Sequence, residues 1–188
     1  HICSAEEIRL LRAAKEQGLP VSVGVTPHHL FFTEQDAVAL GSLGLMKPTL
    51  KTPPDRDALW AAIESGVVDV IESDHAPHTL EEKASATPPY GVPGLETTIP
   101  LMLMAVREGR VTFDRLIDLI STAPRRIFGL PAGENTYTVI DTDETYAIDR
   151  SRLWSACGWS PFEGMRAAGR VREVWIRGER AFDGDMVL

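Results

Sequence analysis

The stretch Ser73-Asp74-His75-Ala76-Pro77-His78 decides how this chain is interpreted. It follows the short Val- and Ile-rich run 66–72, which is typical of a buried strand. One carboxylate and two imidazoles therefore come where the strand should end, and parallel α/β enzymes place their chemistry there. Carboxylate and imidazole are also a usual pair of Zn²⁺ ligands. A polar turn in which Asp74 caps the following residues explains the same pattern, and spacing alone leaves both interpretations open.

The overall composition is that of an ordinary globular protein, with 44% hydrophobic and 24% charged residues in 188. The net charge of −8 provides no basic surface for nucleic acid, and no apolar run is long enough to predict a membrane span. Cys3 and Cys157 form no recognisable disulfide framework, which favours a reducing cytoplasm. The chain begins with His1 and lacks a signal-peptide pattern, so we expect a piece of a longer protein.

Strands and helices are expected to alternate up to about residue 130. Ser4 and Glu7 match a capping box, which predicts a helix that ends at Gly18. Runs 41–54 and 79–93 are expected to be loops, and loops as long as the second are usually functional or disordered. The remaining expected elements are strands at 19–25 and 66–72, helices at 33–40, 55–64, 94–108 and 112–120, and a helical turn at 123–129. This alternation predicts parallel β/α units.

From Thr136 onward the pattern changes to short strands. We expect strands at 137–140 and 145–148, then a hairpin of 169–177 and 181–188 that turns at Gly178-Glu179. A complete (β/α)₈ barrel needs about 250 residues, so this chain can hold only some of its units. The sequence therefore predicts an α/β fold in which residues 1–130 form the C-terminal portion of such a barrel and residues 131–188 form part of a small β-sandwich.

Four stretches of the chain share one resemblance. They are His-Ile-Cys-Ser at 1–4, Val-Thr-Pro-His-His-Leu at 25–30, Ser-Asp-His-Ala-Pro-His-Thr-Leu-Glu-Glu-Lys at 73–83 and Gly-Val-Pro-Gly-Leu-Glu-Thr at 91–97. Together they resemble class I dihydroorotases of the amidohydrolase superfamily, including the dihydroorotase domain of the eukaryotic trifunctional pyrimidine protein. Residues 159–164 and 169–171 resemble the C-terminal β segment of that family. Allantoinases and dihydropyrimidinases share Ser-Asp-His but generally lack Ala-Pro-His-Thr.

The resemblance implies an active site with two Zn²⁺ ions. In the family the ions are held by a His-x-His pair, a carboxylated lysine or an aspartate, two further histidines and a last aspartate. Two cations lower the pKa of the water that they share, which makes hydroxide available near neutral pH. His1 matches the histidine of the sixth strand and Asp74 matches the aspartate of the eighth. Asp74 is also expected to carry a proton from the hydroxide to the leaving amide nitrogen.

The resemblance also implies contacts with the substrate. His78 matches the residue at the carboxylate side of dihydroorotate, and Tyr90 and Gly91 lie where the family offers backbone groups to the ring. Lys47 lies where relatives have Asn or Arg, and it would act as a point charge because it cannot form the paired hydrogen bonds of Arg. A solvated loop lysine is the other interpretation of Lys47.

Other residues have expected roles near this site. A structural role is favoured for His28 and His29 over a catalytic one, although one of them could orient a ligand. His75 is expected to form hydrogen bonds within its loop, and Cys3 is expected to be buried rather than reactive. Gly24 lies where many relatives have Glu, so we expect one carboxylate to be missing near the site.

The function implied by the resemblance is a Zn²⁺-dependent hydrolase of cyclic amides. It would interconvert N-carbamoyl-L-aspartate and (S)-dihydroorotate in de novo pyrimidine (UMP) biosynthesis, as a homodimer or in a complex with aspartate transcarbamoylase. The alternatives are an allantoinase, a dihydropyrimidinase or hydantoinase, and an inactive dihydroorotase-like scaffold for a transcarbamoylase. The chain by itself is expected to be inactive, because the first metal ligands are missing from it.

Overall fold

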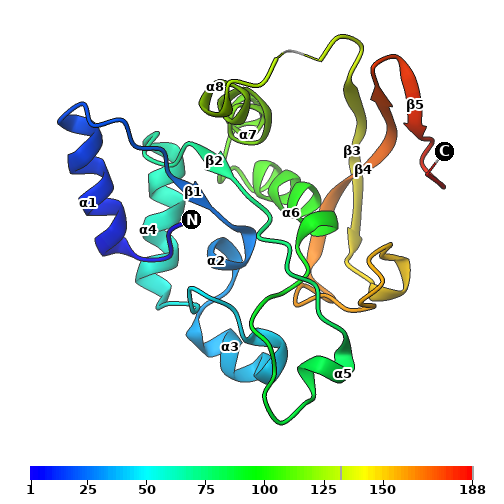
Figure 1. The fold of residues 1–188 in the computed structure, drawn as a ribbon, viewed down its shortest axis with the longest axis horizontal. Coiled ribbons are helices and arrows are strands. Elements are labelled where there is room, and N and C mark those ends of the chain that lie inside the picture. Colours follow the sequence, from blue (N-terminus) through cyan, green and yellow to red (C-terminus); the bar gives the residue numbers. More distant parts are fainter. Residues whose placement is uncertain (132, 188) are drawn as a thin grey trace.

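The computed structural model describes residues 1–131 and 133–187 (Figure 1). Helices surround a short parallel strand pair in the first part of the chain, and an antiparallel sheet stands beside them. The elements are α1 (Ala5–Glu16), β1 (Gly24–Val25), α2 (Pro27–Phe31), α3 (Glu34–Leu40), a 3₁₀ turn (Gly41–Gly44), α4 (Pro53–Glu64), β2 (Val70–Ile71), α5 (Leu80–Lys83), α6 (Leu95–Arg107), α7 (Phe113–Ile117), a π-helical turn (Asp118–Thr122), α8 (Ala123–Phe128), β3 (Tyr137–Ala147), a second 3₁₀ turn (Arg150–Arg152), β4 (Arg166–Ile176) and β5 (Glu179–Phe182).

Capping side chains fix where the N-terminal helices begin. The Ser4 hydroxyl accepts a hydrogen bond from the backbone N–H of Glu7, whose carboxylate accepts the N–H of Ser4 in return, so the predicted capping box is confirmed. Thr33 opens α3 in the same way. At α4, Thr52 is the N-cap, and the helix begins at Pro53, slightly earlier than expected, because proline is favoured in a first turn.

The two strands before the polar runs pair in parallel, with Gly24 opposite Val70 and Val25 opposite Ile71. The pairing confirms an α/β fold, because a parallel pair needs a crossover such as the one that contains α4. Both strands are much shorter than the expected runs 19–25 and 66–72. In the described part of the chain each strand pairs only with the other. The pairing is limited to two residues of each strand, near the C-terminal end of each expected run.

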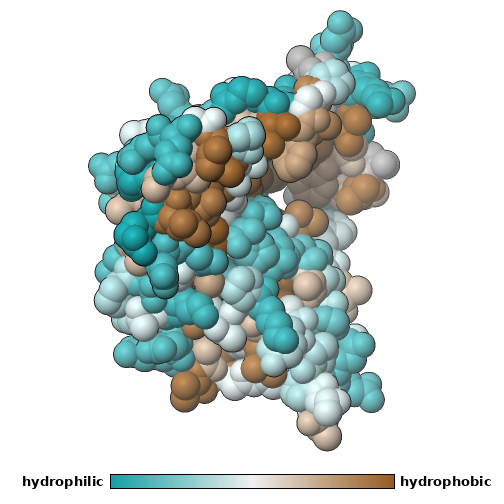
Figure 2. Space-filling model, turned by 60° about the vertical axis from the view of Figure 1, so that its left-hand side comes forward, coloured by the Kyte–Doolittle hydropathy of each residue, from teal (hydrophilic) through white to brown (hydrophobic). Residues whose placement is uncertain are grey.

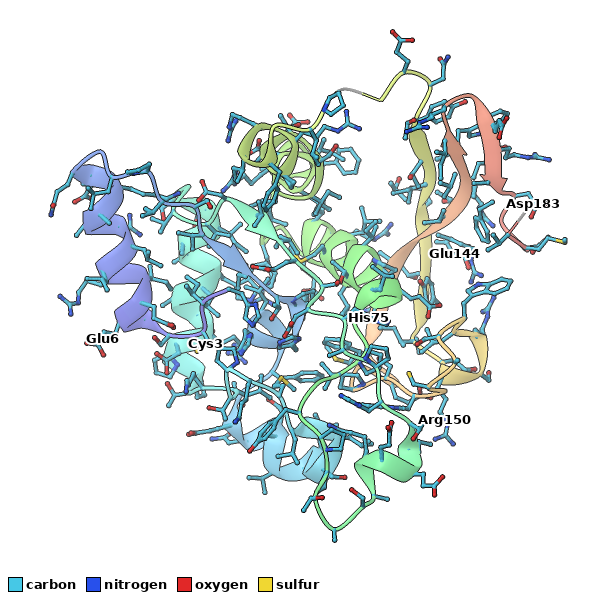
Figure 3. All side chains as sticks on the ribbon, in the orientation of Figure 1. Cys3, Glu6, His75, Glu144, Arg150 and Asp183 are labelled. Carbon is cyan, nitrogen blue, oxygen red and sulfur yellow. The ribbon has the colours of Figure 1, made fainter. Side chains whose placement is uncertain are left out.

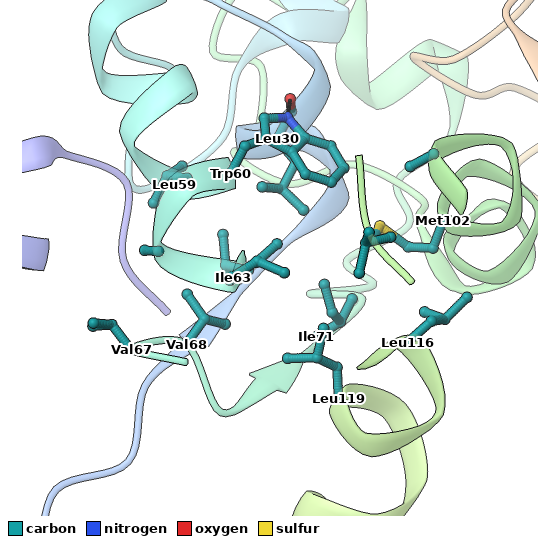
Figure 4. Close-up of a cluster of buried hydrophobic side chains, with 14 of the residues drawn as sticks. Leu30, Leu59, Trp60, Ile63, Val67, Val68, Ile71, Met102, Leu116 and Leu119 are labelled. Carbon is teal, nitrogen blue, oxygen red and sulfur yellow. Dashed lines mark hydrogen bonds between the residues drawn. The ribbon is translucent and has the colours of Figure 1, made fainter. Parts of the chain in front are cut away.

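The main core lies between β1, β2 and the helices α2, α4, α6 and α7 (Figure 4). Its fully buried members include Leu30, Leu59, Ile63, Met102 and Leu119. Met102 fills the core, as its position on a helix predicted. Each such side chain stabilises the fold by about 1.5–3 kcal/mol relative to its exposed state. The last residues of β1 and β2, Val25 and Ile71, pack in this core, and the candidate site is built beyond them.

The antiparallel sheet has the order β3-β4-β5. The two expected strands 137–140 and 145–148 are one strand, β3, because register shifts near Ile140 and Thr145 take up the extra residues. The predicted hairpin exists, but it turns at Arg177-Gly178, where both residues have positive φ, rather than at Gly178-Glu179. Strand β5 ends at Phe182, short of the expected 181–188, and Leu188 and Ala132 lie outside the described residues.

Two expected loops contain regular structure. Thr79 and Glu82 form a capping box that opens the one-turn helix α5 inside the run 79–93. The run 41–54 contains a 3₁₀ turn and the start of α4. The expected helix 112–120 and the turn at 123–129 are continuous through the π-helical turn and end at Gly129, which has a φ of 62°.

Apolar side chains gather in a patch on the upper part of one face, bordered by hydrophilic groups (Figure 2). Exposed side chains that gather in this way are typical of a surface that contacts other protein segments. Among the residues that the structure describes, no helix is both long and apolar enough to cross a membrane.

Candidate active site

Asp74 lies just beyond the C-terminal end of β2 and has a backbone φ of 45°. Positive φ is uncommon for a residue other than glycine, although aspartate tolerates it better than most. Such conformations concentrate at functional sites. The helix that follows, α5, is capped by Thr79 rather than by Asp74.

Two imidazoles face the carboxylate of Asp74. The Nε2 atom of His1 lies 3.5 Å from Asp74 Oδ2, and the Nε2 atom of His28 lies 3.8 Å from the same oxygen. The N–H of Ile2 donates to the carbonyl of Gly24, so the chain brings His1 alongside β1. His28 comes from the helix α2 that follows β1. The ends of two neighbouring strands thus bring together three side chains that are distant in sequence.

His29 has a structural place. Its Nε2 atom donates to the carbonyl of Pro48 at 3.0 Å, and its Nδ1 atom accepts from the hydroxyl of Thr26 at 2.8 Å. Burial lowers the pKa of His29 to about 4. Both ring nitrogens are therefore occupied, and the neutral ring joins α2 to the segment after Met46.

His28 differs from His29 because its buried Nε2 atom has no hydrogen-bond partner. The side chain is only 1% exposed, and burial, assisted by the neighbouring His29, lowers its pKa to about 3. An unpartnered buried polar atom is costly and often marks a functional position. A neutral imidazole directed at Asp74 can orient that carboxylate or accept a proton.

The donor types at Asp74 fit part of a zinc site. An imidazole nitrogen and a carboxylate oxygen are both Zn²⁺ ligands, and a catalytic zinc needs about three protein ligands. The described residues contain no group of three or more such side chains arranged to hold a metal. His1 and Asp74 could therefore serve as two ligands, and further ligands would have to come from elsewhere.

A second carboxylate lies next to the site, in a place that the sequence did not predict. The Glu72 carboxylate occupies the space that a side chain at position 24 would fill. Position 24 therefore provides no carboxylate, as expected, and the carboxylate of Glu72, the residue that follows β2, takes up that space. Burial, followed by the charge of Glu72, raises the pKa of Asp74 above its ordinary value.

The predicted substrate contacts form a group beside Asp74. His78 Nε2 donates to the carbonyl of Tyr90 at 3.1 Å. Gly91 has a φ of 124°, and a Cβ atom there would collide with Ala76, so only glycine allows this approach. The N–H of Ala76 donates to the carbonyl of Val92, which joins the run 73–78 to the run 91–94.

Lys47 belongs to the same group. Its ammonium lies 4.2 Å from the centre of the Tyr90 ring, a cation–π contact between two exposed side chains. The N–H of Gly91 donates to the carbonyl of Leu45, which ties the two segments together. The structure thus places His1 with Asp74, and His78, Tyr90 and Gly91 with Lys47. The His29–Pro48 bond and the short run from Asp74 to His78 connect the two groups.

His75 and Cys3 lie outside these two groups. His75 lies near the first turn of α6, where its Nδ1 atom accepts the N–H groups of Gly94 and Leu95 (Figure 3). Its partners are at the helix start rather than within its own loop. Cys3 is 5% exposed, and burial beside Glu7 raises the pKa of its thiol to about 11, so the prediction of a buried cysteine is confirmed.

Lys83 was missed by the sequence analysis, although it touches the site. It is completely buried and donates to three backbone carbonyls. Nothing in Glu81-Glu82-Lys83 indicates burial, because such a charged run is usually solvated. A separate cleft of about 250 Å³ lies between α6 and the antiparallel sheet, where Glu96, Tyr146 and Trp154 line it. None of the predicted site residues lines that cleft.

Comparison with known proteins confirms the resemblance to dihydroorotases. The chain is 45% identical over 189 residues to multifunctional protein CAD of Squalus acanthias, covering all of this chain and 8% of that protein. It is 37% identical over 194 residues to the dihydroorotase of Pyrococcus furiosus, covering all of this chain and 45% of that enzyme. The chain therefore spans less than half of the length of these curated relatives. No protein-family model matches it.

Solved structures give the same picture of the fold. The L-hydantoinase (dihydropyrimidinase) of Arthrobacter aurescens superposes on the whole chain with a TM-score of 0.90 at 28% identity, and 45% of that enzyme is covered. The inactive dihydroorotase-like domain of a Chaetomium thermophilum CAD-like multifunctional protein superposes with a TM-score of 0.80 at 25% identity, and 51% of it is covered.

Proposed function

We propose that the protein containing this chain is a Zn²⁺-dependent dihydroorotase that interconverts N-carbamoyl-L-aspartate and (S)-dihydroorotate in pyrimidine biosynthesis. The observation that carries the proposal is the convergence of His1 and His28 on one oxygen of Asp74. This contact is joined to a second group of residues, in which Lys47 offers a cation, His78 an imidazole, and Tyr90 and Gly91 backbone groups to a small anionic substrate. The identities of 37% to a dihydroorotase and 45% to multifunctional protein CAD, each over the whole of this chain, support this choice.

The fold supports the same proposal. The parallel β1–β2 pair with its crossover helix is what a portion of a (β/α)₈ barrel requires. We assign residues 1–130 to the C-terminal part of an amidohydrolase barrel and residues 131–188 to part of a small β-sandwich. Asp74 then lies at the C-terminal face of a barrel strand, where enzymes of this fold carry out their chemistry.

Asp74 is the proposed proton carrier. Zn²⁺ held by His1, Asp74 and further ligands outside the described residues, two ions in the complete site, would supply an activated water for attack on the ring carbonyl. The Asp74 carboxylate takes the proton of that water and gives it to the ring nitrogen that leaves. His28 is neutral, and its unpartnered Nε2 atom faces the same carboxylate oxygen at 3.8 Å.

Substrate recognition is assigned to the second group. The substrate carries a carboxylate, and Lys47 offers an exposed ammonium on the face of Tyr90. His78 is held from both sides, because its ring donates to Tyr90 and its carbonyl accepts from the Trp159 indole at 2.6 Å. The backbone at Tyr90 and Gly91 would contact the polar edge of the ring. Lys47 therefore supplies the positive charge for an anionic ring, and His78 is assigned a contact beside it.

Two alternatives keep specific support. The close superposition on the L-hydantoinase fits a dihydropyrimidinase, hydantoinase or allantoinase, which act on related cyclic amides. The likeness to an inactive dihydroorotase-like domain fits a scaffold for a transcarbamoylase. A cytoplasmic location and a homodimer or a complex with aspartate transcarbamoylase complete the proposal.

The deciding experiment is a substrate panel. The full-length protein, loaded with Zn²⁺, is assayed on dihydroorotate, dihydrouracil, hydantoin and allantoin. We expect a clear preference for dihydroorotate. A preference for one of the other three would reassign the substrate, and no activity on any of them with zinc bound would favour the scaffold. The upstream gene sequence is an independent check, because a His-x-His segment and a strand-end Lys or Asp are needed for the enzyme.

A further inference from the structure

Lys83 is a buried cation without an acidic partner. Its side chain is completely buried, and no ion pair involves it among the residues that the structure describes. Its ammonium donates to the carbonyls of Leu45 at 3.2 Å, Pro89 at 3.0 Å and Gly91 at 3.0 Å. The Trp159 ring covers it, with the ring centre 5.6 Å from Nζ.

This arrangement uses every donor that a lysine has. An ammonium carries three N–H groups and no acceptor, and each N–H meets one carbonyl. Burying a charge is costly unless its hydrogen bonds are complete, and bonds from a charged donor are roughly twice as strong as neutral ones. Burial also lowers the pKa of Lys83. An apolar side chain of the same size could fill this space, but it could not form the three hydrogen bonds to backbone carbonyls.

The three carbonyls belong to two segments that carry the proposed substrate contacts. Leu45 lies two residues before Lys47, and Pro89 and Gly91 flank Tyr90. The N–H of Gly91 adds a direct bond to the carbonyl of Leu45. Helix α5, which carries Lys83, starts two residues after His78, whose carbonyl accepts from the same tryptophan that covers Lys83. One ammonium thus ties both substrate-contacting segments to α5.

We infer that Lys83 is a positioning residue for the substrate pocket. Its three hydrogen bonds hold segment 45–47 and segment 89–91 at a fixed separation, so that Lys47, Tyr90 and the Gly91 backbone meet the substrate together. The inference rests on the proposed function, since it deepens the assignment of these segments to substrate binding. It predicts an effect on substrate binding rather than on the chemical step, because Lys83 touches neither Asp74 nor His1.

The test uses the full-length zinc-loaded protein. Lys83→Met keeps the length and the apolar stem but removes all three donors, and Lys83→Gln keeps two donors on a shorter side chain. Lys51→Met, which removes an ammonium that donates to the Thr49 hydroxyl at 2.9 Å, is the matched control. KM and kcat for dihydroorotate are measured with the zinc content, and hydrogen exchange of the peptide covering 84–92 is followed by mass spectrometry.

We expect KM to rise about tenfold or more in Lys83→Met, with a smaller rise in Lys83→Gln, while kcat stays within about threefold. Exchange of 84–92 should be at least tenfold faster in Lys83→Met, and Lys51→Met should resemble wild type in both measurements. A kcat loss with unchanged KM, or unchanged exchange at 84–92, would overturn the inference. If Lys83→Met does not fold, Lys83→Gln decides by the same two readouts.

The two proposals fail in different ways. If the wild-type protein does not act on dihydroorotate, the proposed function is wrong, and the exchange measurement still shows whether Lys83 holds the segments together. If the wild type is active and KM is unchanged in both variants, the function stands and the positioning role is wrong.

Discussion

The Glu72 carboxylate occupies the space into which a side chain at position 24 would extend, although Gly24 lies on β1 and Glu72 directly follows the neighbouring strand β2. The hydrogen bond from the N–H of Glu72 to the carbonyl of Val25 keeps the strand ends side by side. The absence of a side chain at Gly24 therefore makes room for the carboxylate of Glu72, the residue after β2.

This arrangement predicts that substitutions at the two positions are not additive. Gly24→Ala should push the half-exposed Glu72 side chain away, with a small cost in stability because that side chain is flexible. Glu72→Ala should reduce kcat/KM by about two- to fivefold, corresponding to about 0.5–1 kcal/mol. Gly24→Ala should match it, and the double variant should lose no more than either one.

The measurement is a double-mutant cycle on kcat/KM of the full-length protein, with Glu64→Ala as the control because Glu64 is an exposed glutamate at the end of α4. Losses that simply add would show that the two positions act independently.

Asp74→Asn should abolish turnover. Asparagine keeps the shape of the side chain, but it cannot carry a proton and is a poorer Zn²⁺ ligand. We expect kcat to fall at least about a thousandfold in the full-length protein, with the fold intact by circular dichroism. A near-normal rate in this variant would remove Asp74 from its proposed role.

His78→Ala should mainly weaken substrate binding. The ring donates to the carbonyl of Tyr90, whose own ring contacts the Lys47 ammonium, so His78 belongs to the substrate-binding group rather than to the His1–Asp74 contact. KM should therefore rise about tenfold, corresponding to about 1.4 kcal/mol, while kcat changes little. Steady-state kinetics on dihydroorotate measures KM and kcat separately. A large fall in kcat at unchanged KM would instead place His78 in the chemical step.

The buried pair His28 and His29 should make the metal-free protein sensitive to mild acid. Folding lowers their pKa values to about 3 and about 4, from an ordinary value near 6.5. The unfolded chain therefore binds more protons between these values, so stability is complete above about pH 6.5 and falls as the pH drops toward 4. At pH 5.5 each histidine should cost about 1.4 kcal/mol relative to pH 8.

Urea unfolding at pH 8 and pH 5.5, with EDTA present, measures this difference. The variant His28→Gln/His29→Gln is expected to be less stable at pH 8 but to lose less stability between the two pH values. A wild-type protein equally stable at both would contradict the assignment of these rings as neutral.

Residues 1–188 expressed alone should bind less zinc than a two-metal site requires and should not hydrolyse dihydroorotate. His1 and Asp74 are the proposed ligands, and the described residues contain no group of three or more potential ligands arranged for a metal. Zinc content by atomic absorption, together with the dihydroorotate assay, measures both properties. Two tightly bound Zn²⁺ per chain, or measurable turnover, would show that other residues of this chain complete the site.

Short-range signals let the sequence predict much of the fold. Ser4 and Glu7 predicted the start of the first helix, because a capping box is formed by residues three apart and needs no distant partner. The change from a Val- and Ile-rich run to Ser-Asp-His likewise marked the end of β2. Apolar residues of this kind favour a buried strand, whereas a run of polar residues is typical of the segment that follows it. The expected strands were too long, because strand length depends on neighbours that the sequence does not identify.

Only the tertiary structure decided the surroundings of the site. The sequence named His1 and Asp74 by resemblance, but their 3.5 Å contact and the approach of His28 depend on the pairing of β1 with β2. It also missed that Glu72 fills the place beside Gly24 and that Lys83 is buried. A charged residue can be buried only when distant groups complete its hydrogen bonds, and one partner of Lys83, the Leu45 carbonyl, is 38 residues away in the chain.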